Sequence, residues 1–200
     1  MQSNNDIDER IRAVAGRPLS ATDRSAEQAA GRPIVYLMRG LPSCGKSTTA
    51  RRIAGADGIV IETDAYFQGE KPGPEHYSFA PDRLETARQW TLDAFRDALA
   101  KRISPIVIDR GNGRNPESKI YAQLADQAGY KIALCEPESP WWNEIRVLMR
   151  YRPATDPVLD AWADELSRIS RSTHRVSSRT IRRWMDHWVD DLAVEQILNC

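Results

Sequence analysis

Few folds accommodate the segment 34–47, in which five apolar residues, 34–38, lead through Arg39 into Gly-Leu-Pro-Ser-Cys-Gly-Lys-Ser. The spacing is GxxxxGKS, a pattern in which a buried strand delivers the chain to a glycine-containing loop and a helix carries it away. Residues 47–54 contain neither proline nor glycine, and Gly55 follows them, so they predict that helix. The segment therefore predicts a strand, a loop and a helix whose backbone N–H groups converge on a polyphosphate.

The glycines, the lysine and the serine of this loop each have a chemical role in phosphate binding. Gly40 and Gly45 allow the backbone to turn tightly and to approach phosphate oxygens without a Cβ in the way. Lys46 is placed to reach the β and γ oxygens of a nucleoside triphosphate, and the Ser47 hydroxyl is placed to ligate Mg²⁺. The predicted nucleotide-binding residues are Gly40, Leu41, Pro42, Ser43, Cys44, Gly45, Lys46, Ser47 and Thr48.

Three more apolar runs predict further strands, and helical segments separate them. The runs cover residues 58–62, 105–109 and 130–135, and the intervening helices are expected at 81–102 and 116–128. Beyond Pro140 the sequence predicts helices only. Strands that alternate with helices in this way are typical of an α/β fold, a parallel sheet with helices on both faces. Because ligands of such sheets bind beyond the carboxyl ends of the strands, the loop 40–47, Asp64 and Asp109 are expected on one rim.

Asp64 is the best candidate for a general base. It follows the predicted second strand, and a carboxylate there can accept the proton of an attacking hydroxyl. The alternative is structural, because Thr63-Asp64 is also suited to capping the following turn.

Asp109 ends the predicted third strand, where an acidic residue can hold Mg²⁺ through water. It could instead orient a substrate or brace the turn 110–115. A base at one strand end and a carboxylate near the metal form an arrangement suited to phosphoryl transfer.

Charge is balanced over the whole chain, 28 basic against 28 acidic residues, so no overall field draws it toward nucleic acid or membrane. Between residues 146 and 183, however, nine arginines stand against four acidic residues. A helical lid that carries arginine, expected at about 146–178, can close over phosphates and stabilise the transition state. A genome that favours arginine codons would give the same bias. The eligible lid residues are Arg150, Arg152, Arg168, Arg171 and Arg175.

The remaining composition predicts a cytoplasmic protein. The three cysteines are scattered and lack metal-ligand spacing, which favours a reducing compartment. No apolar stretch has the length of a membrane span, and the first residues do not resemble a signal peptide. Residues 1–31 are expected to form a polar extension, either a short helix or disordered, before one domain at 32–200.

Several motifs together resemble the NEDD4-binding-protein-2-like kinases, which belong with the 5′-polynucleotide kinases. The likeness extends over about residues 34–190. The motifs that carry it are residues 37–48, 62–67 and 77–82 with Ala87 and Trp90, then 103–109 with Asn112 and 115–116, and finally Glu136-Pro137 and Trp141.

This resemblance implies an adenylate-kinase-like P-loop NTPase fold and transfer of the γ-phosphate of ATP to a 5′-hydroxyl, with Mg²⁺ as the metal. By the resemblance, Asp64 would be the base, and Arg171 best matches the catalytic lid arginine. Arg168 and Arg150 stay candidates, because the lid contains an insertion at about 151–165. The sequence also departs from the family at Phe67, where some polynucleotide kinases carry a basic residue, and at 110–112.

Two other functions stay open. The first is a P-loop kinase for a small molecule such as a sugar, a nucleotide-sugar or an antibiotic, which the balanced charge favours. The second is a nucleotide-binding module without catalysis, against which the intact Lys46, Ser47 and Asp64 argue. The expected partners are ATP and a 5′-hydroxyl nucleic acid or nucleotide, with no membrane.

Overall fold

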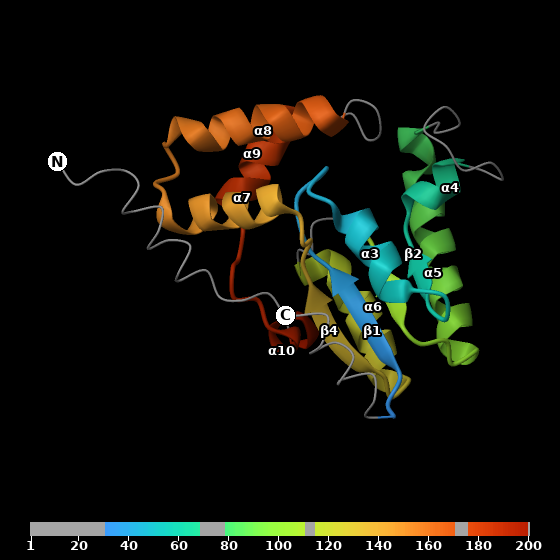
Figure 1. The fold of residues 1–200 in the computed structure, drawn as a ribbon. Helices are drawn as coiled ribbons and strands as arrows, with labels where there is room; N and C mark the ends of the chain where they lie inside the picture. Colours follow the sequence, from blue (N-terminus) through green and yellow to red (C-terminus); the bar gives the residue numbers. More distant parts are fainter. Residues whose placement is uncertain (1–30, 69–78, 111–114, 171–175, 200) are drawn as a thin grey trace.

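The computed structural model describes residues 31–68, 79–110, 115–170 and 176–199. Its centre is a parallel sheet in the order β2-β3-β1-β4 (Figure 1). The strands are β1 (Ile34–Met38), β2 (Ile59–Ile61), β3 (Ile106–Ile108) and β4 (Lys131–Cys135). β1 lies between two partners, with Val35 paired to Ile106 on one side and to Ile132 on the other. Each strand falls within the apolar run that predicts it.

Helices follow the strands as the sequence predicts. The bounds are α3 (Lys46–Ala54), α4 (Asp64–Gln68), α5 (Leu84–Ala100), α6 (Asn115–Gln127), α7 (Pro140–Tyr151), α8 (Pro157–Ser170), α9 (Ser178–Asp186) and α10 (Val194–Leu198). The helix expected at 81–102 begins with a short 3₁₀ turn, η2 (Pro81–Arg83), before α5. None of the helices in the described ranges is long and apolar enough to cross a membrane.

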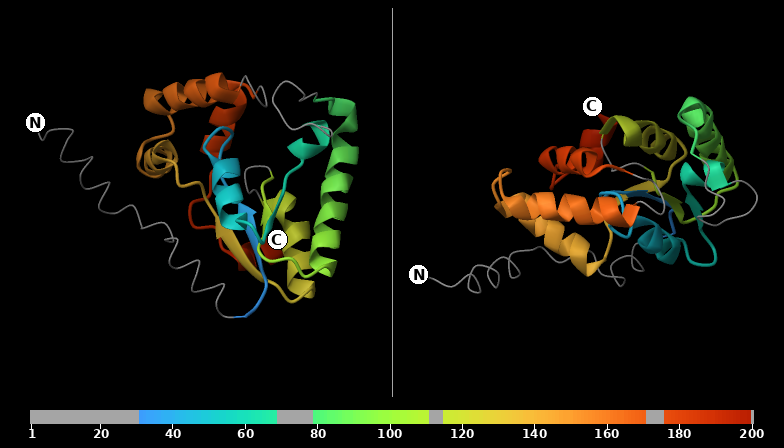
Figure 2. Two further views of the ribbon diagram at one scale, coloured as in Figure 1. Left: turned by 45° about the vertical axis from the view of Figure 1, so that its right-hand side comes forward. Right: turned by 90° about the horizontal axis from the view of Figure 1, so that it is seen from above.

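Alternating side chains of β1 enter two different cores, because successive residues of a strand point to opposite faces. Val35 and Leu37 pack with residues of α5, α6 and α10, whereas Tyr36 and Met38 pack with residues of α3. Figure 2 shows the sheet between these helices in two further views. The predicted α/β fold with helices on both faces is confirmed.

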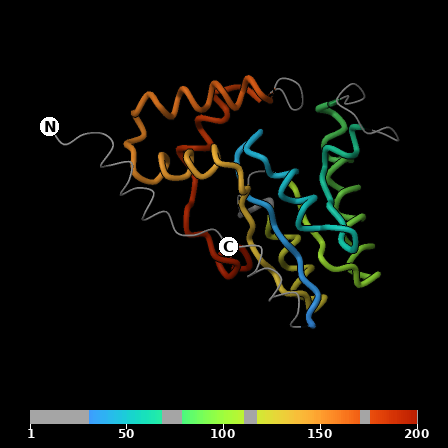
Figure 3. The backbone as a smooth tube through the Cα atoms, in the orientation of Figure 1, coloured from blue at the N-terminus to red at the C-terminus, as the bar shows by residue number. Residues whose placement is uncertain are grey.

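A third core joins the loop after β1 to the helices α7, α8 and α9. Its buried residues include Leu41 and Cys44 of the loop, Trp142 of α7, Leu166 of α8 and Ile181 of α9. The backbone trace shows these three helices gathered beyond the end of β1 that leads into the loop (Figure 3). The predicted insertion at 151–165 supplies the connection between α7 and α8 and the first part of α8. The loop is therefore packed against α7, α8 and α9 as well as connected to the sheet.

Candidate functional site

The loop between β1 and α3 has the backbone that phosphate binding requires. Gly40 and Gly45 have φ values of 141° and 95°, and Ser43 also has a positive φ of 60°. A Cβ at Gly40 would lie only 2.7 Å from the Cys44 Sγ. Glycine at this position is thus demanded both by the backbone angle and by the space beside it.

Lys46 lies across this loop. Its Nζ donates hydrogen bonds to the carbonyl oxygens of Gly40 and Leu41, at 3.0 and 2.8 Å. Lys46 is also the first residue of α3, so the unpaired backbone N–H groups of that helix begin at this residue. A cationic side chain and a helix N-terminus at one loop form a site for a polyphosphate.

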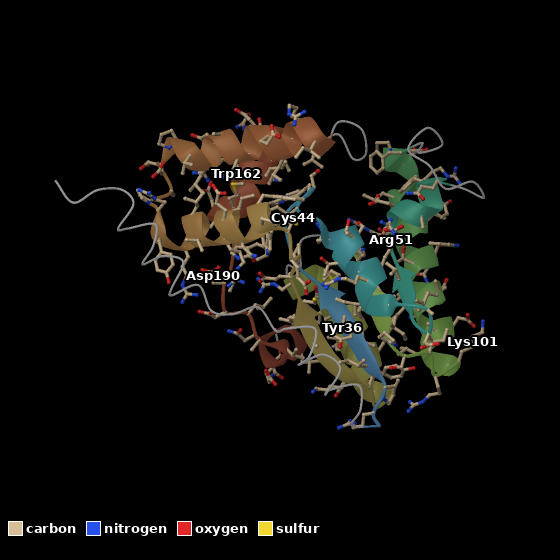
Figure 4. All side chains as sticks on the ribbon, viewed as in Figure 1. Tyr36, Cys44, Arg51, Lys101, Trp162 and Asp190 are labelled. Atoms are coloured by element: carbon tan, nitrogen blue, oxygen red, sulfur yellow. The ribbon has the colours of Figure 1, made fainter. Side chains whose placement is uncertain are left out.

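Cys44 contributes structure to the loop. Its side chain is fully buried, and burial raises the pKa of the thiol to about 11 although the charge of Lys46 acts in the opposite direction. A thiol with this pKa is protonated at neutral pH and is a poor nucleophile. Figure 4 labels Cys44 where the loop meets the helices of the third core.

The segment after β4 braces the loop from outside. The Ser139 hydroxyl donates to the carbonyl oxygen of Cys44 at 2.7 Å and accepts from the Trp142 backbone N–H at 3.2 Å, which caps α7. The Trp141 indole N–H donates to the Ser43 carbonyl oxygen at 3.3 Å. We did not predict these contacts. Ser139-Pro140 is a recognisable helix start, but nothing in the sequence links that start to the loop.

Arg39, directly before the loop, is the centre of a buried ionic network. Its guanidinium lies 3.3 Å from Glu136, and its Cζ lies 4.5 Å from the ring centre of Trp188. Glu136 also contacts Arg146, at 3.2 Å, and accepts from the Trp142 indole N–H at 3.1 Å. Burial lowers the pKa of Arg39 and raises that of Glu136, and the attraction between the two groups opposes both shifts.

This network connects parts of the chain that are far apart in sequence. Arg39 donates to the carbonyl oxygens of Val189 and Asp190, in the segment that follows α9. Asp190 is labelled on that segment in Figure 4. The ends of β1 and β4, the helix α7 and the C-terminal segment are therefore held together behind the phosphate loop.

Three acidic residues lie at the neighbouring end of the sheet. Asp109 is buried, and its backbone N–H donates to the Ile61 carbonyl oxygen at 3.0 Å, which joins the ends of β3 and β2. Burial raises the pKa of Glu62, and the charges of Asp109 and Asp64 act in the same direction while Arg51 opposes them. The charge of Asp109 also acts on Cys44. Asp109 therefore follows β3 beside the end of β2, at the carboxyl ends of these strands.

Asp64 is the first residue of α4, on the same rim. Thr63, just before it, is connected to α5 by a hydrogen-bond contact of 3.2 Å between its hydroxyl and that of Thr91. A carboxylate in the first turn of a helix also interacts favourably with the helix dipole. The geometry is therefore compatible with a base and with a structural role.

Mg²⁺ prefers oxygen ligands, and the Ser47 hydroxyl and the Asp109 carboxylate are the candidates here. Ser47 is in the first turn of α3, next to Lys46. The described residues contain no group of three or more His, Cys, Asp or Glu side chains arranged to hold a metal.

The lid arginines that the structure describes have acidic partners. Arg168 is exposed and paired with Glu165, with 2.6 Å between Nη2 and the carboxylate. Arg150 lies 3.5 Å from Asp191, and Arg152 lies 3.9 Å from Asp156. Arg171 and Arg175 lie outside the described residues. The described candidates are thus paired with carboxylates of α8, of the connection between α7 and α8, and of the segment after α9.

The sheet, the glycine-shaped loop and the lysine define a P-loop NTPase. The chain belongs to the AAA domain family AAA_33, whose model matches residues 35–171.

Similar proteins include human NEDD4-binding protein 2, which is 31% identical over 170 residues. That match covers 83% of this chain but only 8% of the human protein, so the chain spans a small part of the relative. Among solved structures, the AvrRxo1-ORF1:-ORF2 complex with ATP is 20% identical with a TM-score of 0.38, over 74% of this chain and 53% of that chain. The native form of that complex is 19% identical with a TM-score of 0.37, over 84% and 57%. Structural likenesses this weak carry no argument about function.

Proposed function

We propose that this P-loop NTPase is a kinase that transfers the γ-phosphoryl group of ATP to the 5′-hydroxyl of a polynucleotide or nucleotide. One observation carries the proposal. The carboxyl ends of β1, β3 and β2 bring a phosphate loop, Asp109 and Asp64 to a single rim. Phosphoryl transfer needs a held nucleotide, neutralised charge and an oriented nucleophile, and this rim offers residues for each.

Lys46 provides positive charge for the phosphates. Its ammonium group now bonds to the carbonyl oxygens of Gly40 and Leu41, so it must exchange these contacts for phosphate oxygens when ATP binds. Mg²⁺ held near Ser47 and Asp109 would neutralise further phosphate charge when bound. Asp64 accepts the proton of the acceptor hydroxyl as that oxygen attacks. Arg171, in the proposed lid, contacts the transferring group when the lid closes. Arg168 and Arg150 are the alternatives, because the insertion at about 151–165 decides which arginine corresponds to the lid arginine of the family.

A small-molecule kinase is the second candidate, and the charge distribution favours it. The described lid arginines are paired with carboxylates, and the chain carries 28 basic and 28 acidic residues. A protein that binds a long nucleic acid is more often strongly basic on one face.

The test is a transfer assay with radiolabelled ATP and a panel of acceptors: 5′-hydroxyl RNA, 5′-hydroxyl DNA, nucleosides and sugars. We expect label on the 5′-hydroxyl nucleic acids or nucleosides. Label on the sugars alone would favour the second candidate.

Asp64→Asn separates catalysis from structure in the same assay. We expect turnover to fall by about 10²–10⁴ while ATP affinity changes only a few-fold, because the base acts on the acceptor and not on the nucleotide. An equal loss of ATP affinity would support the capping role of Asp64.

A further inference from the structure

Aromatic side chains gather where α4 meets the beginning of α5. The ring centres of Tyr66 and Trp90 are 6.0 Å apart, and those of Phe67 and Phe79 are 5.1 Å apart. Tyr66 and Phe67 connect the two pairs, with 5.3 Å between their ring centres. We call these four residues the aromatic cluster. Its centres all lie within the range in which rings contact one another.

The outer members of the aromatic cluster face solvent. Phe79 is 50% exposed and Trp90 is 45% exposed, whereas Phe67 is only 5% exposed and anchors the cluster in the fold. Scattered exposed apolar side chains are ordinary on protein surfaces. Here the exposed side chains are linked through buried or half-buried rings, which holds them in fixed positions.

Arg83 adds a positive charge to the same surface. Its guanidinium lies 5.1 Å from the ring centre of Tyr66 and donates to the Tyr66 hydroxyl at 2.7 Å. Neither contact neutralises the positive charge of Arg83, because the ring and the hydroxyl of Tyr66 are uncharged. A guanidinium fixed against a ring can stack on a base or bind a phosphate in a planar, bidentate manner.

The aromatic cluster is part of the rim that carries the candidate base. Asp64 begins α4, and Tyr66 and Phe67 follow it in the same short helix. The Thr63–Thr91 contact fixes this segment to α5 one residue after Trp90. In Figures 1 and 2, α4 and the beginning of α5 lie at the same end of the molecule as the start of α3.

We propose that Trp90, Phe79 and Tyr66, with Arg83, form a stacking surface for the nucleobase of the acceptor nucleotide whose hydroxyl is phosphorylated. The inference rests on the proposed kinase function and specifies its acceptor as one that carries a base. Aromatic rings bind bases of any sequence because every base has a π face, and arginine beside them adds attraction for the base or the phosphate. A sugar without a base would gain nothing from this surface.

The chain offers a matched control at another place. Tyr151, at the end of α7, is 44% exposed, and the Arg150 guanidinium lies 5.7 Å from its ring centre. This pair also places an arginine against an exposed ring, but it belongs to α7, which does not carry Asp64, the candidate general base. Tyr151→Ala therefore removes an exposed ring without touching the proposed surface.

The test measures binding by fluorescence anisotropy, without ATP, so that it does not depend on turnover. Two single-stranded oligonucleotides with a 5′-hydroxyl and a 3′-fluorescein are compared, identical except that one lacks the base on its 5′-terminal sugar. We expect wild-type protein to bind the complete oligonucleotide about 5- to 150-fold more tightly, the range for loss of one stacked base. Trp90→Ala should reduce this preference, whereas Trp90→Phe and Tyr151→Ala should retain it.

Equal binding of the two oligonucleotides by wild-type protein would overturn the inference, as would an unchanged preference in both Trp90→Ala and Phe79→Ala. The outcome is distinct from failure of the proposed function. If the wild-type protein phosphorylates both oligonucleotides but binds them equally tightly, the kinase proposal stands and the stacking surface is wrong. If it phosphorylates neither but does phosphorylate a sugar, the nucleic-acid acceptor itself is wrong.

Discussion

Gly40 shows how tightly individual residues of the phosphate loop are constrained. An alanine Cβ would meet the Cys44 sulfur at 2.7 Å on a backbone with φ of 141°. We expect Gly40→Ala to weaken ATP binding at least tenfold and to lower the melting temperature, as measured by titration calorimetry and thermal unfolding. Gly55→Ala is the control, because Gly55 also has a positive φ, 60°, but open space around its Cβ. With φ of 60° and ψ of −146° at this position, the substitution should cost about 1–3 kcal/mol of stability and leave ATP affinity unchanged.

The raised pKa of Cys44 predicts a protected thiol. A pKa near 11, against an ordinary 9.0, leaves about a hundredfold less thiolate at neutral pH, and burial blocks access as well. We expect iodoacetamide at pH 7.5 to leave Cys44 unmodified in the native protein and to modify it after denaturation, as measured by peptide mass spectrometry. Rapid modification of native Cys44 would show that the loop opens.

The same pKa difference has a consequence for stability. Between about pH 9 and pH 11 the unfolded chain releases the Cys44 proton while the folded chain keeps it. The folded state therefore binds more protons, and this group makes stability fall as pH rises through that window.

At the scale of elements, the start of α7 couples helix formation to the loop. Ser139 caps α7 and also donates to the Cys44 carbonyl oxygen, whereas Ser177 caps α9 and accepts from the Thr180 backbone N–H at 3.3 Å. Ser139→Ala and Ser177→Ala should each cost about 1 kcal/mol of stability. Only Ser139→Ala should also weaken ATP binding, in a comparison of denaturant unfolding with ATP affinity. Equal ATP affinities would mean that the brace does not influence the loop.

The elements themselves were predictable because their signals are local. The apolar run 34–38, the loop after it and the helix expected at 81–102 each depend on neighbouring residues, and the buried positions Ala87, Thr91 and Phe95 of α5 recur at helical spacing. The rule that ligands bind beyond the carboxyl ends of parallel strands was enough to expect Asp109 and the loop on one rim. The 3₁₀ turn before α5 was not predicted, because Pro81 starts either kind of helix.

The buried role of Arg39 could not be predicted, for a physical reason. Its partners Glu136 and Val189 are 97 and 150 residues away, and an arginine after a strand is ordinarily exposed. The pairing of Arg168 with Glu165 is local and could have been found from their spacing of three residues on a helix. The catalytic roles of Asp64 and Arg171 and the metal-binding role of Asp109 stay predictions.

At the scale of the whole molecule, the third core connects the phosphate loop to three helices, so nucleotide binding is expected to affect those helices as well as the loop. Leu41 and Cys44 share that core with α7, α8 and α9. Binding ATP at about 100 times its Kd should add about 2.7 kcal/mol of stability, which corresponds to a rise of roughly 5–10 °C in Tm for a chain of this size. Hydrogen exchange should slow in α7 and α8 as well as in α3.

Lys46→Ala is the control for this prediction, because it removes the cation that binds the phosphates. It should abolish both the rise in Tm with ATP and phosphoryl transfer. If hydrogen exchange in the wild-type protein slows only in α3, then α7 and α8 do not respond to the nucleotide.

The hydrogen bond from Trp141 to the Ser43 carbonyl oxygen gives the phosphate loop a natural optical reporter. The indole is 39% exposed and bonded to the loop whose Leu41 carbonyl oxygen accepts from Lys46. Its emission is therefore expected to change as ATP enters, without any attached dye, and a Trp141→Phe variant should remove that change. Stopped-flow recording of this signal would time the loop itself, separately from any later movement of the lid.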